Sequence, residues 1–99
     1  YDVLTGLPNR TLLFDRLLQS IVSARREGWK FALMFLDLDR FKAVNDLYGH
    51  VAGDELLQLV GSKLRSMVRE VDTVARFGGD EFVVLFHCIN QKGYAALVA

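Results

Sequence analysis

The 99-residue sequence has little of what would place it in several familiar classes of protein. Its single cysteine, Cys88, cannot form an internal disulfide, so we expect a reducing, cytoplasmic setting rather than a disulfide-stapled secreted domain. No apolar run approaches the length of a membrane span. Twelve basic residues balance twelve acidic ones, so no bulk field attracts nucleic acid or an anionic membrane. We therefore expect neither nucleic acid nor membrane contact from this segment.

What the sequence does have is a hydrophobic fraction of 52% and the patterns of one small domain. The order of helical and strand patterns predicts an α/β (α+β) sandwich with a mixed central sheet flanked by helices. The predicted elements are a packing helix from Thr11 that Gly28 ends, a central strand over 30–38 buried on both faces, helices over 40–48 and 54–69, a hairpin over 75–86, and the start of a helix over 94–99.

The rest of the chain is organised around the predicted hairpin, in which apolar residues run up to a Gly-Gly pair and resume after it. Two adjacent carboxylates, Asp80 and Glu81, stand at its tip, and a second pair, Asp37 and Asp39, closes the strand over 30–38. Either pair alone is more typical of solvated turn acids. Together they favour a site for a hard cation.

The surroundings of Asp37 indicate which ligand such a cation would accompany. Ligands of open α/β sheets gather outside the carboxyl ends of strands, where Asp37 stands. If the hairpin lies beside this strand, Asp37 meets Asp80 or Glu81, and a divalent cation would relieve the repulsion between carboxylates. The next helix begins at once, so its exposed amides and Lys42 would hold phosphate oxygens. The residues predict a nucleoside triphosphate–Mg²⁺ site, although Lys42 alone would read as a solvated surface lysine.

Three other features remain ambiguous from the residues alone. Asn45 lies three residues after Lys42, on neighbouring positions of one helix face, which suits a base contact. Asp54 follows a glycine and would serve equally well as a helix N-cap or as a ligand. Arg69 and Asp72 have the spacing of a common surface ion pair.

Three ordered motifs give the chain a family resemblance. The run Gly78-Gly79-Asp80-Glu81-Phe82 resembles the signature of the GGDEF family, the diguanylate cyclases. Residues 2–10 are similar to that family's N-terminal motif, and residues 37–55 resemble its nucleotide-binding block. Together they cover most of the chain from residue 1 to Phe86.

The resemblance implies a reaction and a role for each matched residue. Two GTP molecules, one on each of two antiparallel protomers of a homodimer, are joined into cyclic di-GMP with release of two pyrophosphates. The role of Glu81, in the metal site or in activating the attacking hydroxyl, stays open. The resemblance assigns catalysis to Asp80 and Glu81, and binding of Mg²⁺ (or Mn²⁺) to Asp37, the Leu38 carbonyl and Asp80. It assigns binding of guanine to Asn45 and Asp54, and binding of phosphate to Arg40, Phe41, Lys42, Gly78 and Gly79. It assigns inhibition by the bound product to Arg69 and Asp72.

Two other functions stay open beside the cyclase. One is a non-catalytic module that binds GTP or cyclic di-GMP and controls an attached domain. The other is a nucleotidyl cyclase with a different product. Intact Asp37, Asp80 and Glu81 favour an enzyme, because a pure receptor has no need of metal acids. Since family domains run further than this chain, we expect residues 1–99 to be a single partial domain, incomplete at its C-terminus, with any membrane anchor lying in other domains.

Overall fold

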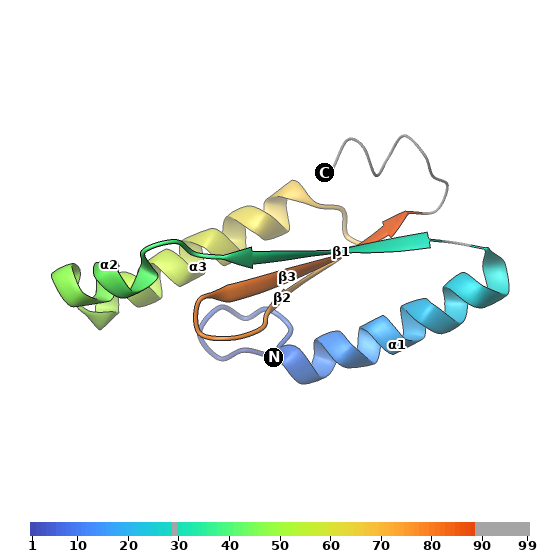
Figure 1. The fold of residues 1–99 in the computed structure, drawn as a ribbon, viewed down its shortest axis with the longest axis horizontal. Helices are drawn as coiled ribbons and strands as arrows, with labels where there is room; N and C mark the ends of the chain where they lie inside the picture. Colours follow the sequence, from blue (N-terminus) through green and yellow to red (C-terminus); the bar gives the residue numbers. More distant parts are fainter. Residues whose placement is uncertain (29, 89–99) are drawn as a thin grey trace.

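The computed structural model describes residues 1–28 and 30–88, and within them the chain forms an α/β sandwich (Figure 1). The α/β fold class predicted from the sequence is confirmed, although the described strands pair only antiparallel and not in the mixed sheet that was expected. The helix predicted over 94–99 lies outside the described residues. None of the described helices is long and apolar enough to cross a membrane. The elements in order are α1 (Arg10–Glu27), β1 (Lys30–Asp37), α2 (Phe41–Tyr48), α3 (His50–Met67), β2 (Thr73–Arg76) and β3 (Glu81–Cys88).

The described strands form an antiparallel sheet in the order β1-β3-β2. The hairpin predicted from the Gly-Gly pair is confirmed, since β2 pairs with β3 from Thr73↔Leu85 to Arg76↔Phe82. In this part of the chain β3 is the central strand, whereas the sequence placed β1 at the centre. The apolar run of β1 marks a strand but not its neighbours, and Phe35 on β1 remains 67% exposed.

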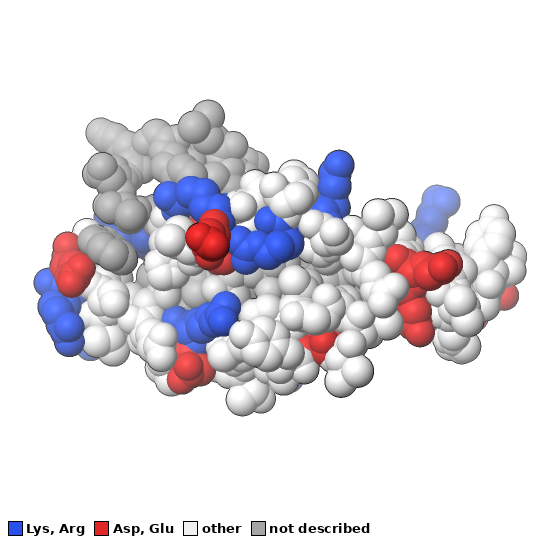
Figure 2. Space-filling model, turned by 180° about the vertical axis from the view of Figure 1, so that it is seen from behind, with Lys and Arg blue, Asp and Glu red and all other residues white. Residues whose placement is uncertain are grey.

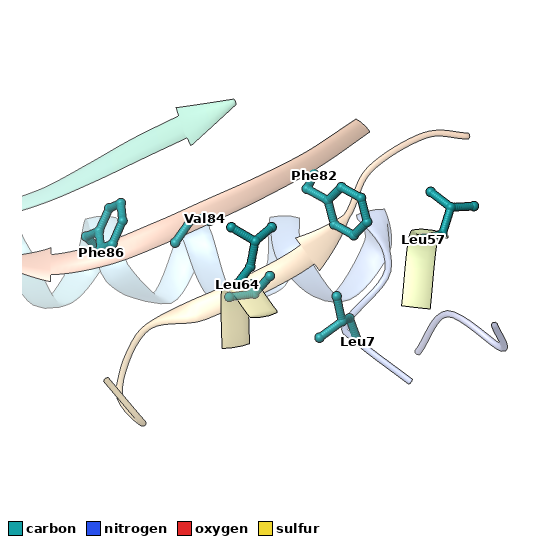
Figure 3. Close-up of a cluster of buried hydrophobic side chains, with 7 residues drawn as sticks. Leu7, Leu57, Leu64, Phe82, Val84 and Phe86 are labelled. Atoms are coloured by element: carbon teal, nitrogen blue, oxygen red, sulfur yellow. The ribbon is translucent and has the colours of Figure 1, made fainter. Parts of the chain in front are cut away.

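Two hydrophobic clusters, one on each face of β3, hold the layers together. Alternate side chains of a strand point to opposite faces, so β3 divides its apolar residues between α1 and α3. Figure 3 shows the side chains of the N-terminal loop, α3 and β3 gathered on one face. The cluster on the α3 side contains Leu7, Leu57, Leu64, Val74, Phe82, Val84 and Phe86, and the one on the α1 side contains Leu13, Ala75, Val83 and Leu85.

The ends of α1 follow the rules of helix capping that the sequence indicated. The Asn9 side chain accepts a hydrogen bond of 2.9 Å from the backbone N–H of Leu12. Gly28 adopts the left-handed conformation, with φ of 75°, and its N–H donates to the Ala24 carbonyl. These caps fix where α1 begins and ends.

The start of α3 differs from the prediction. The helix begins at His50, so Asp54 lies within it, and the prediction that Asp54 caps its N-terminus is wrong. Gly53, which the predicted start of the helix left outside it, is a buried residue inside α3. The apolar residues at the ends of α2 and α3 are largely exposed: Leu47 (74%) and Tyr48 (73%), either of which the helical pattern would turn inward, and Met67 (67%), which the same pattern would bury.

Candidate functional site

The pairing of β1 with β3 brings the predicted acids to one edge of the sheet. Asp37, the last residue of β1, lies directly opposite Glu81, the first residue of β3. One step further, the Leu38 N–H donates a hydrogen bond of 3.0 Å to the Asp80 carbonyl. Directly opposite residues of an antiparallel pair share a face, so two negative side chains stand next to each other. The expectation that the hairpin lies beside the strand over 30–38 is confirmed.

The chemistry of this edge suits a hard cation. Like charges opposite each other on two strands are destabilising, and a bound cation offsets this cost. Within residues 1–28 and 30–88, no three His, Cys, Asp or Glu side chains converge as a closed metal cage. An open edge of Asp37, Asp80 and the Leu38 carbonyl nevertheless fits Mg²⁺, which uses one or two protein carboxylates and fills its remaining positions with water and phosphate oxygens.

The two glycines of the hairpin turn differ in their surroundings. A Cβ at Gly78 would overlap Oε1 of Glu81, so the missing side chain makes room for that carboxylate. Nothing lies within 4 Å of the corresponding point at Gly79. Gly79 is therefore the open side of the turn, and close approach of a nucleotide there stays a prediction.

Arg76, which the sequence analysis did not single out, fixes the shape of this turn. Its guanidinium donates to the carbonyls of Gly78 (3.2 Å) and Gly79 (2.8 Å) and to both carboxylate oxygens of Asp2 (3.3 Å). Burial opposes ionisation of Asp2, but hydrogen bonds from Thr5 and the charge of Arg76 outweigh it and lower the pKa of Asp2. One side chain thus joins the N-terminal motif to the hairpin.

Phe77 anchors the same turn on the other side. The Arg10 guanidinium lies 4.1 Å from the centre of the Phe77 ring, a cation–π contact. The rings of Phe14 on α1 and Phe35 on β1 meet Phe77 edge to face, each at 6.0 Å. The turn that carries Asp80 is therefore held between α1 and β1.

The N-terminus of α2 lies directly after the acidic edge. Arg40 adopts a left-handed conformation, with φ of 62°, and no described side chain caps the helix. The Phe41 N–H donates a long bond of 3.4 Å to the Leu38 carbonyl, and Lys42 is exposed on the first turn. Three of the five residues predicted to bind phosphate are thus next to the predicted metal ligands, at a helix end of positive potential.

The two residues predicted to bind guanine lie together where α2 and α3 pack. The half-buried side chain of Asn45 occupies the space above Gly53, in which a Cβ would overlap its Oδ1 atom. Asp54 is the next residue and is exposed. Gly53 is a further residue that the sequence analysis missed, because its partner comes from another helix.

The segment Arg69 to Asp72 forms a turn at the far end of β3 in which Asp72 is buried and the other three residues are exposed. Asp72 is only 1% exposed, and its carboxylate accepts hydrogen bonds from the backbone N–H groups of Arg69 (2.9 Å) and His87 (3.0 Å). Burial disfavours the charge, but these bonds and the Arg69 ion pair at 3.5 Å lower the pKa of Asp72. The interpretation as a surface ion pair is wrong for Asp72. A cavity of about 390 Å³, lined in part by Glu70 and His87, opens beside the turn.

Charges of both signs are interspersed on the surface. Figure 2, which views the molecule from behind, shows basic and acidic side chains on one face without a continuous stripe of either sign. The functional features are thus local: the acidic edge, the helix ends beside it, and the turn at the opposite end of β3.

The chain is an α/β sandwich in which an acidic sheet edge adjoins a helix N-terminus, an arrangement suited to a metal ion and phosphate oxygens. Comparison with known families makes the assignment specific, because residues 1–99 match the family described as diguanylate cyclase, GGDEF domain. The chain belongs to this family.

Relatives of known name support the assignment. The chain is 59% identical over 97 residues to MucR of Pseudomonas aeruginosa, a bifunctional diguanylate cyclase/cyclic di-GMP phosphodiesterase, covering 98% of this chain and 14% of MucR. It is 52% identical over 85 residues to NbdA of the same organism, a cyclic di-GMP phosphodiesterase, covering 86% of this chain and 11% of NbdA. The chain thus spans a small part of these relatives.

Solved structures share the fold. The isolated GGDEF domain of TpbB (YfiN) from Pseudomonas aeruginosa is 43% identical, with a TM-score of 0.90 over 99% of this chain and 56% of that one. The GGDEF domain of DgcB from Caulobacter crescentus, solved with cyclic di-GMP, is 32% identical, with a TM-score of 0.88 over 98% of this chain and 56% of that one. The DgcB domain is thus a relative whose structure contains cyclic di-GMP.

Proposed function

We propose that this domain acts as a diguanylate cyclase, which joins two GTP molecules into cyclic di-GMP. In each of two equivalent steps, the 3′-hydroxyl of one GTP loses its proton and forms a bond to the α-phosphorus of the other, and the bond from that phosphorus to pyrophosphate breaks. The observation that carries the proposal is the register that sets Asp37 opposite Glu81, with Asp80 beside them. Because GTP is a nucleotide of the cytoplasm, we place the domain there.

The residues around the acidic edge divide the work. Asp37, Asp80 and the Leu38 carbonyl would hold Mg²⁺ (or Mn²⁺), an ion that offsets developing negative charge and orients phosphate oxygens when bound. Lys42 and the amides at Arg40 and Phe41 would hold phosphates, since they begin a helix immediately after the edge. Glu81 would take part in the metal site or accept the proton of the attacking hydroxyl.

Guanine would lie against the α2–α3 junction. Asp54 would accept hydrogen bonds from the N–H groups of the base, and Asn45 would contact the same base from the neighbouring helix. Their closeness through Gly53 supports this arrangement. One protomer offers one such site, so joining two GTP molecules calls for a homodimer whose sites face each other.

We also propose that residues 1–99 form a single partial domain. The family match extends over the whole chain, yet the chain covers 56% of a solved chain that comprises only a GGDEF domain. Experiments therefore use the full-length gene product.

The turn from Arg69 to Asp72 would bind the product and inhibit the enzyme. Arg69 is 40% exposed in its side chain, and its position is fixed by the buried Asp72 and by a hydrogen bond to the His87 carbonyl. The cavity next to the turn is lined by Glu70, Val71 and His87 but not by Arg69 or Asp72, so the proposal rests on the exposed guanidinium of Arg69. Asp72 would thus act by holding Arg69, and Arg69 would meet the product.

Replacement of Arg69 tests this regulation. We expect Arg69→Ala to raise the concentration of cyclic di-GMP needed for half-inhibition by tenfold or more, because a charged contact is worth about 1.5–3 kcal/mol. The measurement is cyclase rate against added product, with Lys63→Ala, an exposed charge on α3, as control. Unchanged inhibition in Arg69→Ala would rule the site out.

A second candidate function is a regulatory module that binds GTP or cyclic di-GMP without converting it. The observation that favours it is the 52% identity to NbdA, whose name describes only a phosphodiesterase. A relative can thus keep a similar domain beside another activity.

One experiment separates the two candidates. The full-length gene product is incubated with GTP and Mg²⁺, and the nucleotide products are identified, alongside an Asp80→Ala, Glu81→Ala variant. Cyclic di-GMP that forms with the natural protein and not with the variant supports the cyclase. GTP or cyclic di-GMP that binds but is never converted supports the regulatory module, and a different cyclic product indicates another nucleotidyl cyclase.

A further inference from the structure

Gly53 lies where glycine is unfavourable for helix formation. It is the fourth residue of α3, is buried, and sits in a helix that alanine would stabilise. Its φ is not among the positive values found at Gly6, Gly28 and Gly49, so the backbone does not require glycine. The reason for a glycine here must come from the space around it.

That space is filled by the side chain of Asn45. A Cβ at Gly53 would overlap Oδ1 of Asn45 and lie 2.9 Å from its Cγ, while Phe41 Cζ would be at an ordinary 3.4 Å. The overlapping atom is the end of a side chain, so an added methyl group would displace the amide and leave the backbone in place. The absent Cβ therefore acts on one group, the Asn45 amide.

We infer that Gly53 is a positioning residue that seats the Asn45 amide and thereby sets the preference for guanine. The inference rests on the proposed contact of Asn45 with the base. With Oδ1 resting on Gly53, the NH₂ branch of the amide is the one left to donate to a base acceptor. Guanine offers O6 and N7 as acceptors and N–H donors for the carboxylate of Asp54, a combination that adenine lacks.

The test compares Gly53→Ala with two other variants of the full-length gene product. Gly61→Ala is the matched control, because Gly61 is also buried in α3, and its added Cβ would lie 3.0 Å from Leu7 Cδ1. Asn45→Ala removes the amide itself. We expect Gly53→Ala and Asn45→Ala each to raise the KM for GTP by about tenfold to a hundredfold, the range of one lost hydrogen bond, with kcat largely retained.

The decisive result comes from the double variant. If Gly53 acts through Asn45, adding Gly53→Ala to Asn45→Ala changes the KM no further. The inference is overturned if Gly53→Ala keeps the natural KM, if it weakens GTP binding further in the Asn45→Ala background, or if Gly61→Ala has the same effect.

A second readout separates this inference from the proposed function. If the natural protein neither binds nor converts GTP, the proposed function fails, but the seating of Asn45 can still be measured by thermal unfolding. We then expect Gly53→Ala to raise Tm in the Asn45→Ala background, where the methyl group meets no amide, by more than in the natural protein. Equal changes of Tm in both backgrounds would show that Gly53 does not position the Asn45 amide.

Discussion

At the scale of single residues, the site is shaped by side chains that occupy the space of glycines. Glu81 lies over Gly78 as Asn45 lies over Gly53. In both pairs the glycine comes from a motif of the sequence and the polar oxygen from a residue predicted to act. Such a pair fixes the direction of a flexible side chain before a ligand arrives, which lowers the cost of ordering it on binding.

This arrangement predicts that substitution of the two glycines of the hairpin turn affects different kinetic constants. Gly78→Ala would push the Glu81 carboxylate aside, so we expect kcat to fall about tenfold to a hundredfold, the typical loss of a positioned acid or base, with KM little changed. Gly79→Ala points into open space, so we expect it to act mainly on KM by obstructing the nucleotide. Steady-state kinetics with GTP measure both. A loss confined to KM in Gly78→Ala would contradict the assignment.

The sequence predicted residues whose role follows from local pattern and missed those with distant partners. Asp37 and Glu81 were predictable because the end of a strand and the tip of a hairpin can be recognised from local sequence patterns. Arg76 was not, since its partner Asp2 is 74 residues away and its other partners are main-chain carbonyls. Gly53 was not predictable either, because its contact, Asn45, comes from another helix.

At the scale of elements, the hairpin turn depends on what surrounds it. Arg76 fixes its carbonyls, Phe77 packs against α1 and β1, and the Arg76 N–H donates to the Pro8 carbonyl at 3.0 Å. The sequence predicted the hairpin from its glycines, but it could not show these attachments. It likewise predicted β1 but placed this strand, and not β3, at the centre of the sheet, because an apolar run carries no information about strand order.

The geometry of Arg76 predicts that lysine cannot replace it. A guanidinium donates to two carbonyls and a carboxylate at once, whereas an ammonium on a flexible stem does not match this planar fork. We expect Arg76→Lys to lose more than tenfold in kcat, because Asp80 and Glu81 are carried by the loosened turn, with a smaller loss of Tm. Arg65→Lys, at an arginine of α3 that donates to the carbonyls of Arg69 and Asp72, serves as comparison. Equal activity of Arg76→Lys and the natural protein would contradict the prediction.

At the scale of the whole molecule, two carboxylates hold opposite ends of the sheet. Asp2 ties the N-terminal loop to the hairpin turn through Arg76, and Asp72 ties the turn before β2 to the end of β3 through His87. Neither connection is local in sequence. At each end of the sheet, ion pairs and hydrogen bonds thus connect segments that are distant in the sequence. Between these ends, the hydrophobic clusters hold the helices against the sheet.

These two carboxylates predict how stability depends on pH. The folded pKa of Asp2 and of Asp72 lies below the ordinary value of 3.8, because hydrogen bonds to the charged form outweigh burial. An acid whose pKa is lower in the folded state than in the unfolded state stabilises the fold. This contribution is complete above the unfolded pKa and is lost as pH falls through the folded pKa. We therefore expect the free energy of unfolding to be flat toward neutral pH and to drop below about pH 4. Denaturant unfolding of the full-length gene product across this range measures it.

Asp72→Asn separates this contribution from acid effects elsewhere. The amide keeps the shape of the side chain but turns an acceptor into a donor toward the N–H groups of Arg69 and His87. At neutral pH we expect a loss of about 1–3 kcal/mol, the cost of a buried group left without its partner. The difference between the variant and the natural protein should narrow as pH falls below 4 and disappear below the folded pKa of Asp72, where the natural carboxyl is protonated in the folded state as well. Asp15→Asn, an exposed acid on α1, should follow the natural curve throughout. A constant difference between Asp72→Asn and the natural protein at every pH would show that Asp72 acts through packing and not through its charge.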